Sequence, residues 1–197
     1  STDGTLATLT REFGLAPFPE AYWKRLPIQP LRGIYRSALH PNLRVLDKAN
    51  GGKADALNAG INAARYPLYC ALDADSIVQP DSLKRVVQPF LQDPATVASG
   101  AAARIANGCT VKDGFIAEVD LPGHALALIQ LVEYLRACLF GRLGWLPMNA
   151  VLILSGAFAV FRKDAVVEAG GYRCDVVDED MELVLRLHRL NRLAGRA

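Results

Sequence analysis

The sequence carries almost no excess of charge of one sign. Its 22 lysines and arginines stand against 20 aspartates and glutamates, which leaves a net charge of +2. A dedicated nucleic-acid binder usually has a strong basic excess on one face. The charge balance therefore argues against nucleic acid as a partner.

Cysteine is also sparse and scattered. The four cysteines, Cys70, Cys109, Cys138 and Cys174, form no C-x-x-C pair, and none has a histidine nearby at zinc-site spacing. We predict reduced thiols in a cytosolic setting rather than a structural disulfide. Cys70 stands inside an apolar run, so we interpret it as a small core residue.

The sequence has no long uninterrupted apolar run and no signal peptide at its start. The longest apolar stretch, residues 145–161, is broken by Pro147, Asn149 and Ser155. A membrane-spanning helix needs about 20 mostly apolar residues. Nothing in this stretch requires a bilayer, although that leaves open spans elsewhere in a longer protein.

The composition and pattern that are present predict one folded α/β domain. The 197 residues are 51% hydrophobic and 21% charged, as in a folded core. We predict helices over residues 5–13, 53–65, 80–91, 126–140, 164–169 and 179–193, and strands over 43–46, 68–72, 96–105 and 151–161. Alternating strands and helices favour a sandwich around a mostly parallel sheet. Residues 17–41 lack periodicity and are interpreted as an irregular insertion.

Two aspartates follow the apolar strand predicted over residues 68–72. In extended backbone, residues two apart point the same way, so the carboxylates of Asp73 and Asp75 can face one ligand. In open α/β sheets, ligands bind at the carboxyl ends of strands. A divalent cation would relieve the repulsion of the pair. Taken alone, the pair is better interpreted as an aspartate-rich turn that caps the next helix, and its position after an apolar strand makes the two interpretations about equal.

Two helix starts carry charged groups with two interpretations each. Lys53 follows Gly51-Gly52 at a predicted helix start, which suits a phosphate but also fits a glycine turn with a solvated lysine. Residues 178–180 are three consecutive acids that open the last helix. Acids stabilise a first helical turn, and a general base near a metal is the alternative. For Lys53 by itself, the glycine turn with a solvated lysine is the better interpretation, whereas the acidic segment alone does not decide.

Taken in order along the chain, five segments resemble the family 2 glycosyltransferases. The likeness is to the membrane-bound processive branch, which includes cellulose, hyaluronan and poly-N-acetylglucosamine synthases. The segments are Ser1–Thr5, similar to the end of the D-D-G-S-x-D-x-T nucleotide motif; Gly51–Asn58, similar to G-K-x-x-A-L-N; Asp73–Asp75, similar to D-x-D; Ser155–Arg162 followed by Gly170–Tyr172, similar to the acceptor-site strand; and Asp178–Asp180, similar to the E-D motif of the catalytic base.

The resemblance implies an inverting, metal-dependent enzyme with the glycosyltransferase A fold, a Rossmann-like sandwich. On the donor side it implies that Asp73 contacts the nucleoside diphosphate of a UDP-sugar and that Asp75, with Asp73, holds Mg²⁺ or Mn²⁺. Lys53 would neutralise the diphosphate. The partners implied are a nucleotide-sugar donor and a glycan acceptor.

On the acceptor side, the resemblance implies that Asp180 takes the proton from the attacking hydroxyl and that Glu179 orients the site. Ser155 and Gly156 would lie along the acceptor, which would be a growing polysaccharide. A non-processive transferase that acts on a lipid-linked or small acceptor is the nearest alternative. Nucleotidyl transfer, or a catalytically inactive nucleotide-sugar-binding or scaffold module, are alternatives of other classes.

Two parts of the family pattern are not found in the sequence. The first strand with its uracil-contacting acid would precede Ser1, and the Q-x-x-R-W motif of processive synthases would follow Ala197. We therefore expect a single catalytic domain, residues 1–197, cut at both ends. The resemblance places the parent protein at the cytoplasmic face of the cell membrane, attached through segments outside this chain.

Overall fold

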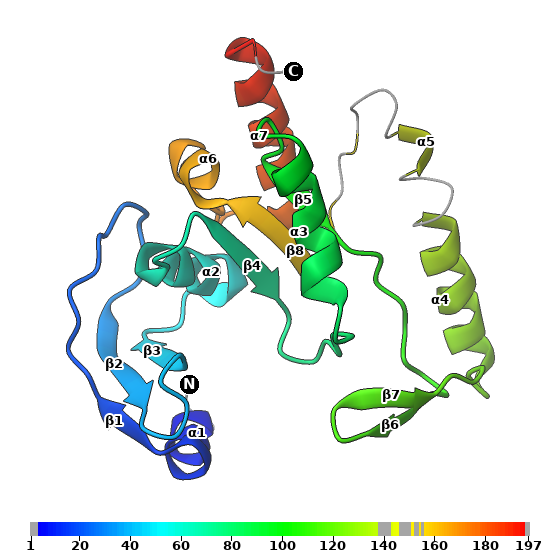
Figure 1. Ribbon diagram of the computed structural model, residues 1–197, viewed down its shortest axis with the longest axis horizontal. Coiled ribbons are helices and arrows are strands. Elements are labelled where there is room, and N and C mark those ends of the chain that lie inside the picture. Colours follow the sequence, from blue (N-terminus) through cyan, green and yellow to red (C-terminus); the bar gives the residue numbers. More distant parts are fainter. Residues whose placement is uncertain (1–3, 138–142, 146–150, 152–153, 155, 196–197) are drawn as a thin grey trace.

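The computed structural model describes residues 4–137, 143–145, 151, 154 and 156–195. Three small sheets and several helices make up this part of the chain (Figure 1). The strands are β1 (Leu15–Pro17), β2 (Leu31–Ser37), β3 (Arg44–Lys48), β4 (Leu68–Leu72), β5 (Ala98–Gly100), β6 (Thr110–Lys112), β7 (Phe115–Glu118) and β8 (Phe158–Arg162). The helices are α1 (Thr5–Phe13), α2 (Gly52–Ala63), α3 (Ser82–Gln92), α4 (Ala125–Arg136), α5 (Leu143–Trp145), α6 (Lys163–Glu168) and α7 (Glu179–Leu193).

The expected mostly parallel sheet is not what the described strands form, because every strand pair among them is antiparallel. The sheet that matters most has the order β4-β8-β5, with β8 antiparallel to both neighbours. Since β4 and β5 each oppose β8, they run parallel to each other, as the β4–α3–β5 crossover predicts. The sequence pattern missed that β8, which comes much later, inserts between them.

Strand β8 is the centre of the core and is buried on both faces. Phe161 and Ala159 pack with Ile61 of α2 and Leu183 of α7, in one hydrophobic cluster. Phe158 and Val160 pack in a second cluster with Val86 and Phe90 of α3. The side chains alternate because successive residues of a strand point to opposite faces. Helices therefore cover both faces of β8, while β4 keeps only Ala71 fully buried.

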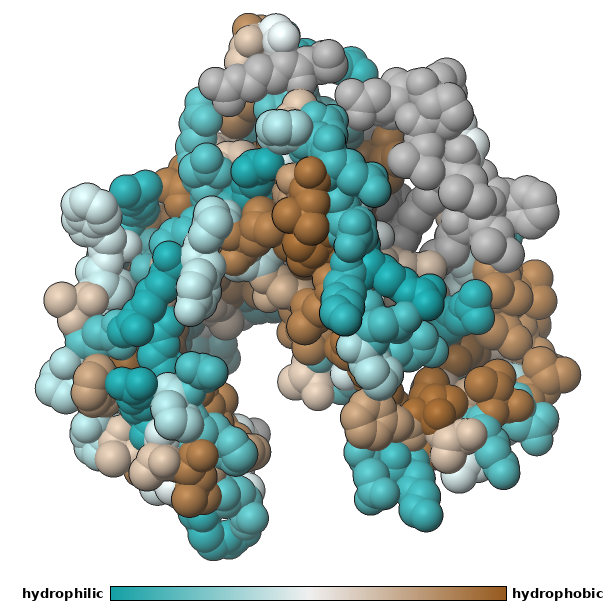
Figure 2. All heavy atoms as spheres, in the orientation of Figure 1, coloured by the Kyte–Doolittle hydropathy of each residue, from teal (hydrophilic) through white to brown (hydrophobic). Residues whose placement is uncertain are grey.

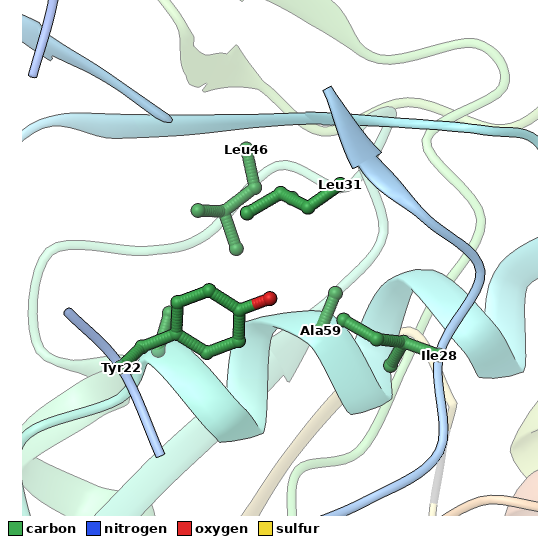
Figure 3. Close-up of a pocket in the computed structure, with 6 residues that line it drawn as sticks. Tyr22, Ile28, Leu31, Leu46 and Ala59 are labelled. Carbon is green, nitrogen blue, oxygen red and sulfur yellow. The ribbon is translucent and has the colours of Figure 1, made fainter. Parts of the chain in front are cut away.

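The first sheet, β1-β2-β3, packs on the outer side of α2. Figure 3 shows Tyr22, Ile28, Leu31, Leu46 and Ala59 turned toward one another between this sheet and the helix. Residues 17–41, expected to be irregular, thus contain β2, which pairs with β3. The sequence did not predict this strand, because apolar and polar residues do not clearly alternate along it. The expected strand over residues 43–46 corresponds to β3.

The apolar side of α4 is exposed rather than part of the core. Leu126, Ile129 and Val132 are each more than half exposed, and hydrophobic atoms gather over α4 and the β6–β7 hairpin in Figure 2. Among the helices that the structure describes, none is both long and apolar enough to span a bilayer.

The cysteine predictions have mixed outcomes. Cys70, Cys109 and Cys174 are free thiols in the structure, and Cys138 lies outside the described residues. The prediction that Cys70 is a core residue is wrong, because its side chain is exposed. On the same face of β4, Leu72 is exposed as well, whereas Ala71 on the opposite face is buried.

Candidate functional site

The end of β4 and the start of β8 lie side by side and bring residues from distant parts of the chain together. Leu72 pairs with Phe158 at the end of the ladder. One residue further on, the backbone N–H of Asp73 donates to the carbonyl of Ala157 at 3.2 Å. Asp73 then turns the chain, with its carbonyl accepting from the N–H of Ser76 at 3.1 Å. The strand pairing therefore places Asp73 opposite Ala157, the residue that follows Gly156.

Lys53 reaches this point from the first turn of α2. The side chain of Asn50 accepts from the N–H of Gly52 at 3.1 Å and fixes the turn that opens the helix. The Lys53 Nζ lies 2.9 Å from Oδ1 of Asp73. It also lies 3.8 Å from a carboxylate oxygen of Glu179 and 3.8 Å from one of Asp180. One ammonium group thus joins the end of β4 to the start of α7.

The start of α7 supplies the acidic side of the site. Glu179 and Asp180 stand in its first turn, where the helix dipole favours negative charge. A β-carbon built on Gly156 would lie 1.7 Å from Oδ2 of Asp180 and 3.4 Å from Nζ of Lys53. The Asp180 carboxylate therefore occupies the space that a side chain at position 156 would need.

The surroundings of Asp180 make its carboxyl group hold a proton more readily than an ordinary aspartate does. Burial raises the pKa of Asp180, and the nearby charges of Glu179 and Asp73 raise it further against the lowering effect of Lys53. Burial acts to lower the pKa of Lys53, but its hydrogen bond to Asp73 and the surrounding carboxylates outweigh this and raise it. Lys53 stays charged, and one cation faces three carboxylates.

Asp75 does not join this ion-pair cluster. Its side chain is exposed in the turn after β4, two residues beyond Asp73. Within the described ranges, no three histidine, cysteine, aspartate or glutamate side chains gather where they could hold a metal ion. The protein would then supply one or two carboxylates and leave the rest of the shell to phosphate and water. That donor set fits Mg²⁺, which seldom occupies an all-protein cage.

Two tyrosines, the partly buried Tyr69 and the buried Tyr172, lie beside the cluster. The hydroxyl of Tyr69 on β4 donates to that of Tyr172 at 3.3 Å, and both rings contact Phe161. Burial raises the pKa of Tyr69 and of Tyr172 above the ordinary tyrosine value, and the charge of Asp180 adds to the effect. Both groups therefore remain neutral hydroxyls.

An open groove of about 490 Å³ lies beside the start of α2. Leu6 and Leu9 of α1 form part of an apolar wall, and Arg32, Lys48 and Asn50 supply polar groups. Gly52, the neighbour of Lys53, also lines the groove. Sequence reasoning missed this groove, because its walls come from α1, β2 and β3, whose packing the motifs do not reveal.

Three buried polar residues on α2, namely Asp55, Asn58 and Asn62, were given no role of their own from the sequence, although Asn58 ends the Gly51–Asn58 motif. Their spacing of three and four residues places them on one face of the helix, a signal that the sequence did contain. Asp55 accepts from the N–H of Gln29 at 2.8 Å and pairs with Lys48. It therefore attaches α2 to the segment that precedes β2 and to the end of β3, whose Lys48 lines the groove.

The structure thus brings together Lys53, Asp73, Glu179, Asp180 and Gly156. Asp75, two residues after Asp73, is exposed and lies outside this ion-pair cluster. Ser155, the other residue expected on the acceptor side, lies outside the described residues. The functional roles of all of these residues remain predictions.

Comparisons with known proteins identify the family. The family model described as glycosyl transferase family 2 matches residues 29–168. The poly-β-1,6-N-acetyl-D-glucosamine synthase of Staphylococcus aureus is 35% identical over 141 residues, which are 71% of this chain and 30% of that protein. The synthase of the same name from Staphylococcus epidermidis is 28% identical over 156 residues, 79% of this chain and 34% of that protein.

The chain thus spans about a third of the length of these curated relatives. The family match covers most of the chain and includes α2, the turn after β4 and β8. The chain belongs to glycosyl transferase family 2.

Proposed function

We propose that this chain is the catalytic part of an inverting, metal-dependent glycosyltransferase that moves a sugar from a UDP-sugar to a glycan. The observation that carries the proposal is the position of Lys53, within ion-pair distance of Asp73 on one side and of Asp180 on the other. A donor-binding group and a potential base thereby share one small site. The glycosyltransferase A fold, with helices on both faces of a central sheet, belongs to the same proposal.

The donor diphosphate binds against Lys53 and the first backbone N–H groups of α2. Helix starts bind anions because their first N–H groups have no partner within the helix. The groove beside Gly52 takes the nucleoside, with Arg32 on its wall. Its mixed apolar and polar lining is typical of small-molecule sites.

Asp73 and Asp75 would hold the divalent cation together with the diphosphate. When bound, that cation neutralises the negative charge that develops on the leaving UDP. Lys53 contributes a second, fixed positive charge on the same side of the site. Because it is already paired with three carboxylates, it needs no reorganisation to do so.

Asp180 removes the proton from the acceptor hydroxyl while that oxygen attacks the anomeric carbon. The new glycosidic C–O bond forms as the bond from the anomeric carbon to the diphosphate breaks, so UDP leaves and Asp180 keeps the proton. Attack from the face opposite the diphosphate inverts the anomeric centre. A raised pKa suits this role, because a base is more effective when its pKa is nearer the working pH.

The acceptor lies along Gly156 and the adjoining Ser155, next to Asp180. Glu179, the more buried of the two helix-start acids, orients Lys53 from the far side. We propose a growing polysaccharide as the acceptor, supported by the names of the staphylococcal relatives. For the whole protein, the resemblance to the processive branch supports action at the cytoplasmic face of the membrane.

The test is UDP release from a UDP-sugar by the protein at its natural full length, compared with its Asp180→Asn variant. The variant should lose at least about 10²-fold in kcat, the usual contribution of a general base. Asp164→Asn is the matched control, since Asp164 is an exposed aspartate in the first turn of α6. Equal rates for native and Asp180→Asn protein would exclude the mechanism. Tight UDP-sugar binding without any turnover would favour an inactive binding module.

A further inference from the structure

Asn58 binds the backbone of a residue 114 positions away. Its Nδ2 donates to the carbonyl of Tyr172 at 2.8 Å, and its Oδ1 accepts from the N–H of Tyr172 at 2.8 Å. Its side chain is 1% exposed, so water does not compete for these bonds. The amide satisfies both backbone groups of one residue, and it thereby fixes the distance from α2 to the segment before α7.

The same segment is held from the other side by α7. The guanidinium of Arg186 donates through Nη2 to the carbonyl of Gly171 at 2.7 Å, and through Nη1 to the carbonyl of Ala169. Arg186 is itself fixed by Glu182, one turn earlier on the same helix. Residues 169–172 are therefore attached to α2 through Asn58 and to α7 through Arg186.

The contact leaves little room for adjustment. Gly171 has a φ of +75°, and a β-carbon there would lie 2.6 Å from Oδ1 of Asn58 and 2.7 Å from Leu26. Tyr172 is 2% exposed and belongs to the same core cluster as Leu183 and Leu187 of α7. Densely packed contacts of this kind transmit a displacement rather than absorb it.

We propose that Asn58 is a positioning residue for the transfer reaction, acting through residues 169–172 and Arg186. This bridge connects the helix that carries Lys53 to the helix that carries Asp180. It sets the separation of the donor-binding ammonium from the base. The inference rests on the proposed function, because only in that reaction do both groups act at the same anomeric carbon. Lys53 acts on the diphosphate whose bond to that carbon breaks, and Asp180 acts on the hydroxyl that forms the new bond.

Asn62 provides a matched control one turn along the same helix face. It is 4% exposed and also holds backbone groups, accepting from the N–H groups of Arg25 and Leu26 at 3.0 Å and donating to the carbonyl of Leu26 at 3.0 Å. The segment that it holds carries none of the proposed site residues and meets residues 169–172 through the apolar Leu26 side chain next to Gly171. Loss of Asn62 should therefore lower stability while both hydrogen bonds of Asn58 to Tyr172 remain and keep the separation of Lys53 and Asp180.

The experiment compares Asn58→Ala, Asn62→Ala, Arg186→Lys and Asp180→Asn in the full-length protein. Measurements of kcat and of UDP affinity are made at a temperature where circular dichroism shows each variant folded. Both alanine variants should have a lower Tm. Asn58→Ala and Arg186→Lys should lose about tenfold in kcat while UDP affinity changes less than about twofold, because small displacements of reacting groups reduce rate far more than binding. Asn62→Ala should keep the native kcat.

Equal kcat values for Asn58→Ala and Asn62→Ala would overturn the inference, since the amide would then contribute to stability alone. If Asn58→Ala fails to fold, Arg186→Lys decides, and an unchanged kcat in that variant overturns the bridge. If instead Asp180→Asn has the native rate, it is the proposed function that fails, and the two failures are distinguished.

Discussion

Gly156 and Asp180 occupy space that only a residue without a side chain can share. A β-carbon on Gly156 would stand 1.7 Å from Oδ2 of Asp180. The two residues belong to segments 24 positions apart in the sequence, before β8 and at the start of α7. Their contact places the carboxylate directly against the chain that precedes the central strand.

Substitution of Gly156 by alanine should displace the Asp180 carboxylate and reduce kcat by about 10²-fold, the scale of the effect of a 1 Å misplacement. Steady-state UDP release measures this. Gly60→Ala is the control, since Gly60 lies within α2 and a β-carbon added there would meet no atom within 4 Å. Alanine at position 60 should leave kcat unchanged and stabilise the helix by about 0.5–1 kcal/mol. A native rate for Gly156→Ala would show that the Asp180 position is not critical.

Replacement of Lys53 by methionine should lower kcat/KM by about 10²-fold or more, because a preorganised positive charge at the diphosphate is lost. Lys53→Arg keeps the positive charge but spreads it over a planar guanidinium, so this variant should retain part of the activity. Lys84 is exposed on α3, so Lys84→Met controls for the loss of a surface charge. If Lys53→Met and Lys84→Met behave alike, Lys53 does not bind the donor.

The acidic limb of the pH–rate profile should lie above the ordinary aspartate pKa. Burial raises the pKa of Asp180, and the base must be deprotonated to act, so kcat/KM falls as pH drops through that raised pKa. Lys53 opposes this shift, and Lys53→Met should therefore move the limb to higher pH. A limb that stays in place in Asp180→Glu and Lys53→Met alike would assign it to another group.

The same shift has a consequence for stability. Because the folded-state pKa of Asp180 is raised, its contribution to stability is full at low pH and is lost as pH rises through that pKa. At neutral pH, Asp180→Asn should therefore raise Tm while it lowers kcat by at least about 10²-fold. Thermal denaturation at neutral pH and at about pH 4, near the ordinary aspartate pKa, tests the sign, and the gain should shrink at the lower pH. A decrease of Tm at neutral pH would contradict the burial argument.

Chelation should abolish turnover, and Mg²⁺ or Mn²⁺ should restore it. In Asp75→Asn, the Mg²⁺ concentration needed for half-maximal rate should rise at least about tenfold, because one of two protein ligands is lost. Asp164→Asn, which alters an exposed aspartate on α6, should need the native concentration. Full activity in the presence of a chelator would remove the metal from the mechanism.

Local sequence signals predicted several elements well. The predicted strand over residues 68–72 and the predicted helix over 179–193 have the bounds of β4 and α7. Both have strong local causes: an apolar run that ends in two aspartates, and acids at a helix start followed by arginines. The helix predicted over residues 5–13 likewise matches α1.

Pairing between distant segments was read less well. The parallel sheet was inferred from the order of elements, and that order does not reveal that β8 inserts between β4 and β5. Cys70 was assigned to the core from its apolar neighbours, although the face of β4 that it shares with Leu72 is exposed. Such features depend on contacts between residues far apart in the chain.

The sequence alone determined which charged residues could take part in chemistry, since the order and spacing of Lys53, Asp73 and Asp180 are written in it. Only the tertiary structure decided that these three meet. The pairing of β4 with β8 places Asp73 opposite Ala157, and Asn58 of α2 and Arg186 of α7 both hold residues 169–172 by hydrogen bonds. The physical reason is that backbone hydrogen bonds and core packing act across any separation in the chain, whereas helix and strand propensities act only between close neighbours.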